Sequence, residues 1–331
     1  MTSSPTLKLI SRAARRISPN SHIVVCVVRN EMLRLPYLLG YYRQLGFDRF
    51  MFVDNASTDG TTEFLRQQPD VSLFYTEDHF GEPPGAGLIW KNTILDRFCA
   101  GHWTLLVDAD ELLIWPGSEH ETVQQLTRKL DECGAEVLFT IMLDMYSDKP
   151  FGEIAYRPGL PFLDFAPFFD RGPYDLLPAG PFPFRQIDGG VRARLYRQYG
   201  LPSAPPVMSK VPLLKWHAGQ RFIVAQHALL NPMPLAPMQG ALLHFKMFDD
   251  LPLKCDVEVG RGEYYAGGRE YRALAMFIRN SPSRCFFDRR ISVRYENTNQ
   301  LQALGLMSPF GSPLPPVPVV SAAAPAAHAG Q

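Results

Sequence analysis

The chain has 331 residues, of which 46% are apolar, so it can bury one large core or a main domain with a smaller partner. Lys plus Arg equals Asp plus Glu at 33 each, so the chain lacks the charge excess that binds nucleic acid or an acidic polymer. Its five widely spaced cysteines include no C-x-x-C pair, which excludes a disulfide framework and a cysteine zinc site and suits a reducing compartment.

The first twenty residues form a basic leader. They lack the apolar segment of a signal peptide, and the longest apolar runs of the chain, such as 23–28, are far shorter than the roughly 20 residues of a membrane span. Lys8, Arg12 and Arg16 lie among apolar residues, so the leader is either solvated or a short amphipathic helix on an anionic membrane surface. We therefore expect a cytoplasmic protein, either free or in peripheral contact with the inner face of the membrane.

Residues 21–145 alternate short apolar runs with longer helical stretches. The predicted strands are 23–28, 49–53, 71–75, 103–107 and 136–143, and the predicted helices are 32–45, 61–67, 88–98 and 119–133. This alternation is typical of βαβ units and predicts an α/β fold with a mainly parallel central sheet flanked by helices. We interpret this half as the nucleotide-sugar-binding half of the domain.

Prolines and aromatic residues are dense from 149 to 212, which predicts short elements and a loop-rich acceptor side. Apolar segments return at 191–196, 211–216, 222–224 and 241–248, and a helix is predicted at 269–279. We assign 146–285 to the acceptor part of the same domain and 286–307 to a C-terminal extension. Residues 308–331, rich in Pro and Ala and almost without charge, are predicted to be a disordered tail.

Two carboxylates, Asp108 and Asp110, follow the predicted strand 103–107. The carboxyl ends of parallel strands are where α/β sheets bind ligands, and two carboxylates at i and i+2 can share one divalent cation. Mg²⁺ and Mn²⁺ prefer oxygen ligands and bridge diphosphates, so the pair predicts a site for a nucleotide-diphosphate donor. Glu111 is either a partner of this site or the start of a helix.

A second group of polar residues follows the first two predicted strands. Arg29, Asn30 and Glu31 come after 23–28, and Asp54 comes after 49–53. The carboxyl ends of these strands are where a nucleoside would lie, and Asp54 could accept hydrogen bonds from a base or a ribose. Residues 57–60 are better explained as a turn and helix cap.

The order of these blocks resembles the glycosyltransferase family 2 superfamily, in the branch near family 92. The blocks are Arg29-Asn-Glu, Gly46-Phe-Asp-Arg-Phe, Asp54-Asn-Ala-Ser-Thr-Asp-Gly-Thr and Asp108-Ala-Asp-Glu, and the resemblance covers roughly residues 22 to 280. It implies a GT-A fold, a nucleotide-sugar donor and inverting transfer in a single displacement.

The resemblance extends to later segments. It implies that a histidine after the acceptor region completes the shell of the Mn²⁺ or Mg²⁺ ion, with His244 preferred to His227. Further residues could contact the donor or neutralise the departing diphosphate, and the alternative for each cation is a solvated surface charge. These residues are Lys91, Asn92, Arg192, Arg194, Lys210 and Lys246.

An inverting transferase needs a base to take the proton of the acceptor hydroxyl. Many family 2 enzymes have a Glu-Asp pair after the acceptor loop, and this chain has none there. Asp188 is the preferred candidate for the base, followed by Asp256 and Glu258. Each could equally be a turn or surface residue.

The sequence therefore predicts a metal-dependent glycosyltransferase that acts in glycan or polysaccharide synthesis. Its acceptor would be a carbohydrate, a lipid-linked sugar or a protein. The alternatives are a phosphatase of the haloacid dehalogenase type, a nucleotidyltransferase and an inactive module that binds a sugar or nucleotide. A phosphatase of the haloacid dehalogenase type normally carries its D-x-D motif on the first strand, whereas here the motif follows the predicted strand 103–107. A nucleotidyltransferase would need a glycine-rich phosphate loop, and none follows the predicted strand 23–28.

Overall fold

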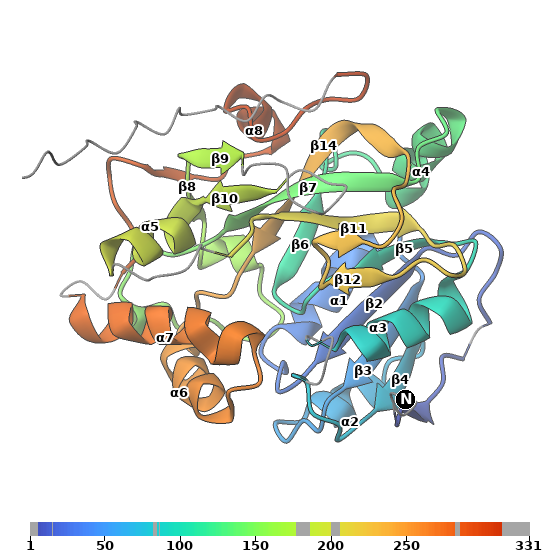
Figure 1. Cartoon of the computed structure of the whole chain (residues 1–331), viewed down its shortest axis with the longest axis horizontal. Coiled ribbons are helices and arrows are strands. Elements are labelled where there is room, and N and C mark those ends of the chain that lie inside the picture. The colour runs from blue at the N-terminus through green and yellow to red at the C-terminus, as the bar shows by residue number, and fades with distance from the viewer. Residues whose placement is uncertain are drawn as a thin grey trace, which may run out of the picture.

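The computed structural model of the chain describes residues 6–14, 16–81, 85, 87–176, 186–199, 206–281 and 285–312. Within them, a nine-stranded sheet forms the centre of the molecule, with helices on both of its faces (Figure 1). In order across the sheet, the strands are β1 (Lys8–Ser11), β4 (Val71–Tyr75), β3 (Arg49–Asp54), β2 (Ile23–Val28), β5 (Trp103–Leu106), β11 (Ser209–Lys215), β7 (Val137–Asp144), β14 (Leu235–His244) and β6 (Glu111–Ile114).

The sheet is mixed, although most of its strands share one direction. β2, β3, β4 and β5 pair in parallel, and so do β7 and β14. β11 is antiparallel to both β5 and β7, which places these two groups in the same direction. β1 and β6 are antiparallel edge strands. The prediction of a mainly parallel sheet flanked by helices is therefore confirmed for six of the nine described strands.

The helices and the smaller sheets complete the described structure. The helices are α1 (Leu35–Gln44), α2 (Thr61–Arg66), α3 (Leu88–Ile94) with a π-helical turn at Leu95–Cys99, α4 (Val123–Glu132), α5 (Gly190–Gln198), α6 (Leu251–Arg261), α7 (Tyr265–Asn280) and α8 (Thr298–Ala303). Short 3₁₀ turns lie at Phe151–Glu153 and Phe162–Asp164. Three two-stranded sheets pair β8 (Phe168–Asp170) with β15 (Ser292–Arg294), β9 (Tyr174–Leu176) with β10 (Ile187–Gly189), and β12 (Phe222–Val224) with β13 (Ala228–Leu229).

Local sequence explains the main elements. All six residues of β3 and five of the six in β2 are buried, as expected for central strands covered on both faces. α1 has a proline in its first turn and buries Leu35, Leu38, Leu39 and Tyr42, which recur at the helical spacing. α4 begins with a capping box in which Thr122 and Gln125 satisfy each other's backbone groups. The elements predicted between 23 and 143 are all present.

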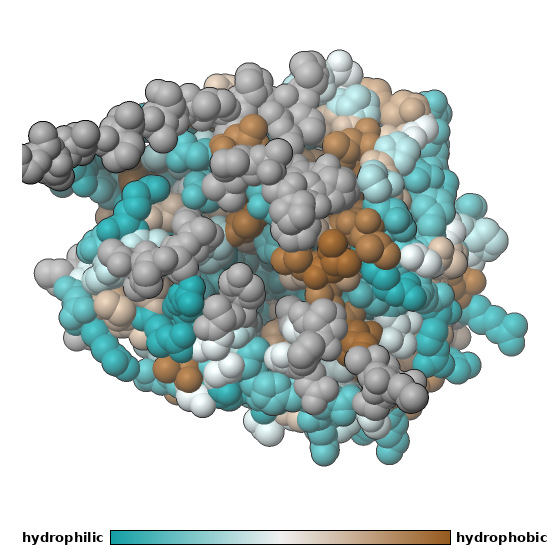
Figure 2. All heavy atoms as spheres, in the orientation of Figure 1, coloured by the Kyte–Doolittle hydropathy of each residue, from teal (hydrophilic) through white to brown (hydrophobic). Residues whose placement is uncertain are grey.

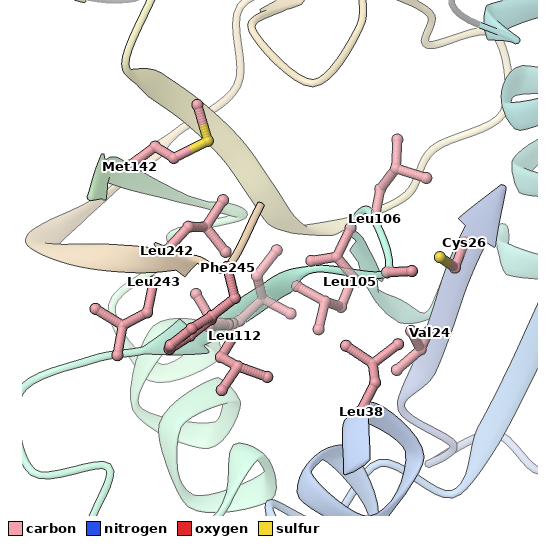
Figure 3. Close-up of a cluster of buried hydrophobic side chains, with 14 of the residues drawn as sticks. Val24, Cys26, Leu38, Leu105, Leu106, Leu112, Met142, Leu242, Leu243 and Phe245 are labelled. Carbon is pink, nitrogen blue, oxygen red and sulfur yellow. The ribbon is translucent and has the colours of Figure 1, made fainter. Parts of the chain in front are cut away.

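The core holds the two halves of the sheet together. Figure 3 shows Val24 and Cys26 of β2 and Leu38 of α1 near Leu105 and Leu106 of β5, with Leu112, Leu242 and Leu243 on the other side of the cluster. All of these side chains are at most 2% exposed. The core therefore fixes the carboxyl end of β5, where Asp108 and Asp110 follow, against β14.

The structure decides between alternatives at the start of the chain and at Glu111, and it corrects the start of the tail. Lys8–Ser11 is a strand that pairs with β4, so the leader forms neither an amphipathic helix nor a purely solvated segment there. Glu111 begins the strand β6 and not a helix, and it pairs with Lys210 beside Asp108. Ser308 pairs with Gln239, so ordered chain continues past the predicted start of the tail, while 313–331 lie outside the described residues. No helix among the described residues is long and apolar enough to span a membrane.

Candidate functional site

A cavity lies at the carboxyl ends of β2, β5 and β14, between the α6–α7 pair and the β12–β13 hairpin. Figure 2 shows a hollow in the middle of this face, with apolar side chains beside it. Among the described residues that line the cavity, seven are Lys or Arg and five are Asp or Glu. The chain as a whole has no net charge, so this local excess of cations favours an anionic ligand.

Asp108 lies at one wall of the cavity and is held by cations. Lys210 Nζ lies 3.2 Å from its Oδ2, Lys91 Nζ lies 3.6 Å from its Oδ1, and Gln226 donates a hydrogen bond of 3.1 Å to Oδ1. Lys210 also forms an ion pair with Glu111, which is fully buried. Burial favours the neutral carboxyl, but Lys210 and Lys91 outweigh it and hold the pKa of Asp108 well below its ordinary value.

Asp110 faces a different partner. Its Oδ2 lies 3.4 Å from Nε2 of His244, and Nδ1 of His244 lies 2.6 Å from Asp144 Oδ1. Burial disfavours the charged imidazole, but Asp110 and Asp144 outweigh it and raise the pKa of His244 to about 9. The ring of His244 therefore lies between two carboxylates that favour its charged form.

A chain of ion pairs extends from Asp144 to the α7 wall. Arg192 Nε lies 2.8 Å from Asp144 Oδ2, and its Nη1 lies 3.5 Å from Glu270. Glu270 also accepts a hydrogen bond of 2.7 Å from Lys246, whose Nζ lies over the ring of Tyr271 at 4.9 Å from its centroid. The charges on this wall are therefore mutually compensated before any ligand binds.

The far end of the cavity, next to β2 and β3, is more open. Arg29 is partly exposed there, and its guanidinium donates a hydrogen bond of 3.0 Å to the backbone oxygen of Asn55. Glu31 forms an ion pair of 2.6 Å with Lys254, which links the end of β2 to α6. The rings of Phe80 and Tyr264 also line the cavity, with their centroids 5.3 Å apart.

Of the residues predicted to bind donor or metal, ten line this one cavity. They are Arg29, Glu31, Lys91, Asp108, Asp110, Arg192, Lys210, His227, His244 and Lys246. They come from segments spread over more than 200 residues of chain, so their convergence is a property of the fold and not of any local motif.

Three residues predicted to bind the donor make hydrogen bonds within or between loops and are not among the described residues that line the cavity. Asp54 is fully buried, and its carboxylate accepts hydrogen bonds from the backbone of Ser57 and the hydroxyl of Thr62. Asn30 accepts a hydrogen bond of 2.7 Å from the backbone of Thr58. Asn92 pairs with both backbone groups of Phe222 and so anchors β12.

None of the three acids proposed as the base is among the described residues that line the cavity. Asp188 is in β10, where it is paired with Asp175 across the strands, and burial followed by Asp175 raises its pKa. Asp256 is on the outer face of α6, with a side chain that is 66% exposed and paired with Arg279. Glu258, the remaining candidate, is paired with Arg261 and is not among the lining residues.

Several lining residues were not identified from the sequence. Gln226, Glu270, Phe80 and Tyr264 lie in segments that are remote from the recognised motifs, and no spacing pattern marks them. Arg194, which was predicted to act on the diphosphate, instead binds Asp170 and does not line the cavity.

A divalent cation would find only part of a shell in this arrangement. Among the described residues, no three His, Cys, Asp or Glu side chains are grouped so that they could hold a metal ion. Asp110 and His244 nevertheless present an oxygen and a nitrogen 3.4 Å apart, and Asp144 supports the second ring nitrogen. Histidines that bind a metal through one ring nitrogen commonly donate the N–H of the other to a carboxylate, as His244 does to Asp144.

The comparisons with known proteins leave the family open, because no family model and no curated protein matches the sequence. Solved structures that match include HddC from Yersinia pseudotuberculosis, 11% identical over 42% of this chain and 70% of that chain, with a TM-score of 0.26. Another is UDP-glucose pyrophosphorylase from Acinetobacter baumanii, 11% identical over 79% of this chain and 83% of that chain, with a TM-score of 0.28. Similarity at this level supports no inference about fold or activity.

Proposed function

We propose that the chain is a metal-dependent glycosyltransferase that binds a nucleotide-diphosphate sugar in the cavity. The observation that carries the proposal is the loop after β5, where Asp108 is held by Lys91 and Lys210 while Asp110 faces His244. Fixed cations and a carboxylate–imidazole pair on opposite sides of one loop suit a ligand that carries a diphosphate and a divalent cation. The order of sequence blocks that resembles family 2 points to the same ligand.

The diphosphate would lie against Lys91 and Lys210. Both lysine side chains are at most 5% exposed, and Asp108 forms ion pairs with both of them at the cavity wall. Cations held in place before the reaction stabilise charge on a leaving group more than mobile surface cations do, because little reorganisation is needed. Asp108 thus positions the two lysines that receive the departing nucleoside diphosphate.

Asp110 and His244 are the residues that would hold Mn²⁺ or Mg²⁺. The donor set fits such an ion, since a carboxylate oxygen of Asp110 and an imidazole nitrogen of His244 face each other. A bound ion of this kind would supply a Lewis acid that offsets the charge on the departing diphosphate. His244 would bind the ion in its neutral form, and Asp144 would orient its ring.

The nucleoside is placed at the open end of the cavity, next to Arg29 and Asn55. Asp54 is not among the described lining residues, and its carboxylate accepts hydrogen bonds from Ser57 and Thr62. We further propose that the sheet is of the GT-A type and that transfer inverts the anomeric centre, both as the resemblance implies. The acceptor would approach from the side of Arg192 and His227.

The rival functions differ in their requirements. A phosphatase of the haloacid dehalogenase type would use the first Asp as a nucleophile, whereas Asp108 is tied to two lysines and an amide. A nucleotidyltransferase would need a phosphate loop after β2, where Arg29, Asn30 and Glu31 stand.

The test is thermal unfolding with UDP or GDP, each with and without Mn²⁺. A ligand that binds only the folded state raises its stability by mass action, so one of the two nucleotides should raise the melting temperature in the presence of Mn²⁺. Asp108→Ala combined with Asp110→Ala should abolish the shift. Asp256→Ala, which removes an exposed acid outside the cavity, is the matched control and should retain it. A parent chain that shifts with neither nucleotide would contradict the proposal.

A further inference from the structure

His227 is a cavity residue that lies on the acceptor side of the proposed site and has been given no chemical role. It lies in the short loop between β12 and β13, after Ala225 and Gln226, and all three residues line the cavity. The sequence suggested a metal ligand, but in the structure the imidazole that faces Asp110 belongs to His244.

Hydrogen bonding fixes the tautomer of His227. Its Nδ1 lies 2.6 Å from the backbone oxygen of Ser209, at the start of β11. A carbonyl oxygen can only accept, so Nδ1 must carry the hydrogen, and the lone pair of the neutral ring is on Nε2. In the described part of the chain, Nε2 makes no hydrogen bond or ion pair, so its lone pair is available to a ligand.

The backbone of the loop is held in a strained shape that fixes the ring. Ala225 has a φ of 39°, in the left-handed region that residues with a side chain rarely adopt. Gln226, the next residue, makes two hydrogen bonds. Its side chain donates to Asp108, and its backbone oxygen accepts a hydrogen bond of 2.9 Å from Val211. The ring of His227 is therefore positioned relative to both Asp108 and β11.

The surrounding charges keep His227 neutral until an anion arrives. Burial, followed by the positive charge of Lys210, lowers the pKa of His227 to about 3, and Arg192 contributes in the same direction. A diphosphate bound to Lys210 would offset that positive charge, although the larger contribution of burial would remain. The ring thus becomes a better proton acceptor when the donor is bound, which is the condition for general base catalysis.

We propose that His227 Nε2 is the base that accepts the proton of the acceptor hydroxyl. This inference rests on the proposed function. As the hydroxyl oxygen forms its bond to the anomeric carbon, its proton passes to Nε2. The bond from that carbon to the diphosphate oxygen breaks, and its electron pair leaves with the nucleoside diphosphate. The imidazolium then returns its proton to water. This step requires an acceptor whose attacking group is a hydroxyl.

The test measures release of UDP or GDP from UDP-glucose, UDP-N-acetylglucosamine and GDP-mannose, with water as the acceptor. His227→Gln places an amide near Nε2 that can form a hydrogen bond but cannot take a proton. His227→Asn retains an N–H near Nδ1 for Ser209 and removes Nε2. A positioned base contributes about 10²- to 10⁴-fold, so we expect both variants to release nucleotide at least about 100-fold more slowly. The Kd for the nucleoside diphosphate with Mn²⁺ should change less than about twofold.

His217→Gln is the matched control, because His217 is half exposed, pairs with Glu136 and lies outside the cavity. It should release nucleotide at the parent rate. The ¹⁵N spectrum of the histidine rings is an independent readout. The resonances that disappear in His227→Asn belong to His227, and in the parent chain at pH 7 they should show the Nδ1–H tautomer. Unchanged release in His227→Gln would overturn the inference. Loss of nucleotide binding in that variant would also overturn it, by assigning the residue to the diphosphate. A parent chain that bound neither nucleotide would instead remove the proposed function.

Discussion

Asp108 and Asp110 are two residues apart on one loop, yet their surroundings differ. Asp108 is surrounded by Lys91, Lys210 and Gln226, which are fixed parts of the protein. Asp110 faces His244, a group that can lose its charge. In the D-x-D pattern the two carboxylates look equivalent. In the structure, Asp108 is paired with lysines that keep their charge, whereas Asp110 is paired with a histidine that can lose its charge.

This difference separates two roles in the proposed function. On the Asp108 side the ammonium groups of Lys91 and Lys210 are already in place, paired with Asp108 and Glu111, so they can donate hydrogen bonds to a diphosphate without a metal. The Asp110 side can exchange a proton for a divalent cation, so its contribution depends on metal and on pH.

The largest effect is expected from Lys210→Met. This change leaves Glu111 buried without a cation, and breaking one partner of a buried ion pair typically costs about 3–5 kcal/mol. Urea unfolding should therefore show a loss of that order in the free energy of unfolding. Lys215→Met, in the same strand, removes an exposed pair with Asp131 and should cost less than about 1 kcal/mol. Similar losses in the two variants would show that the Asp108 side is not an enclosed ion-pair site.

The fold could be predicted from the sequence further than the site could. β2, β3, β4, β5 and the helices between them follow from local apolar periodicity, because each is a complete βαβ unit in sequence. β6 was not predicted, since it begins with Glu111 directly after the motif and is defined by its pairing with the distant β14. β1 was not predicted either, since a basic segment becomes a strand only through the edge of β4.

The site shows the same division. The carboxylates after β5 could be found because strand ends are visible in the sequence. The base could not, because Asp188 and Asp256 were chosen by local motif, and their places in β10 and on the outer face of α6 are set by long-range packing. The hydrogen bond from the backbone of Ser57 to Asp54 is a local contact within the turn, and the sequence did not show that this residue lies behind the cavity lining.

The next effect concerns pH and the Asp110 side. His244 has a pKa raised from 6.5 to about 9, so the folded state holds a proton that the unfolded state releases. The contribution of this proton to the free energy of unfolding is fully present below about pH 6.5 and is lost as the pH rises toward 9. It amounts to about 3 kcal/mol at most, since one pKa unit corresponds to about 1.4 kcal/mol. Unfolding of the metal-free chain by urea at pH 6, 7.5 and 9 should show this decline, and His244→Asn should lack it. Parallel pH profiles for parent and variant would exclude the bridging imidazolium.

The smallest effect is expected from Asp144→Asn. The carboxylate of Asp144 orients His244, and loss of such a support typically weakens metal binding about 10- to 100-fold. Calorimetry with Mn²⁺ and the nucleoside diphosphate identified by thermal shift should show this loss. Affinity for the same nucleotide without metal, which depends on Lys91 and Lys210, should change by less than about threefold. Asp188→Asn, an equal substitution outside the cavity, should leave both affinities unchanged. If the two affinities fell together in Asp144→Asn, the two sides would not be separable.

The most direct test of the account is a crystal structure of the chain with Mn²⁺ and a nucleoside diphosphate, in which the anomalous signal locates the metal. We predict a manganese peak bonded to Asp110 and to Nε2 of His244, with diphosphate oxygens on the metal and on Lys91 and Lys210. A peak bonded to Asp108 with His244 still bridging Asp110 and Asp144, or a nucleotide bound elsewhere on the chain, would contradict the division of roles proposed for the two carboxylates.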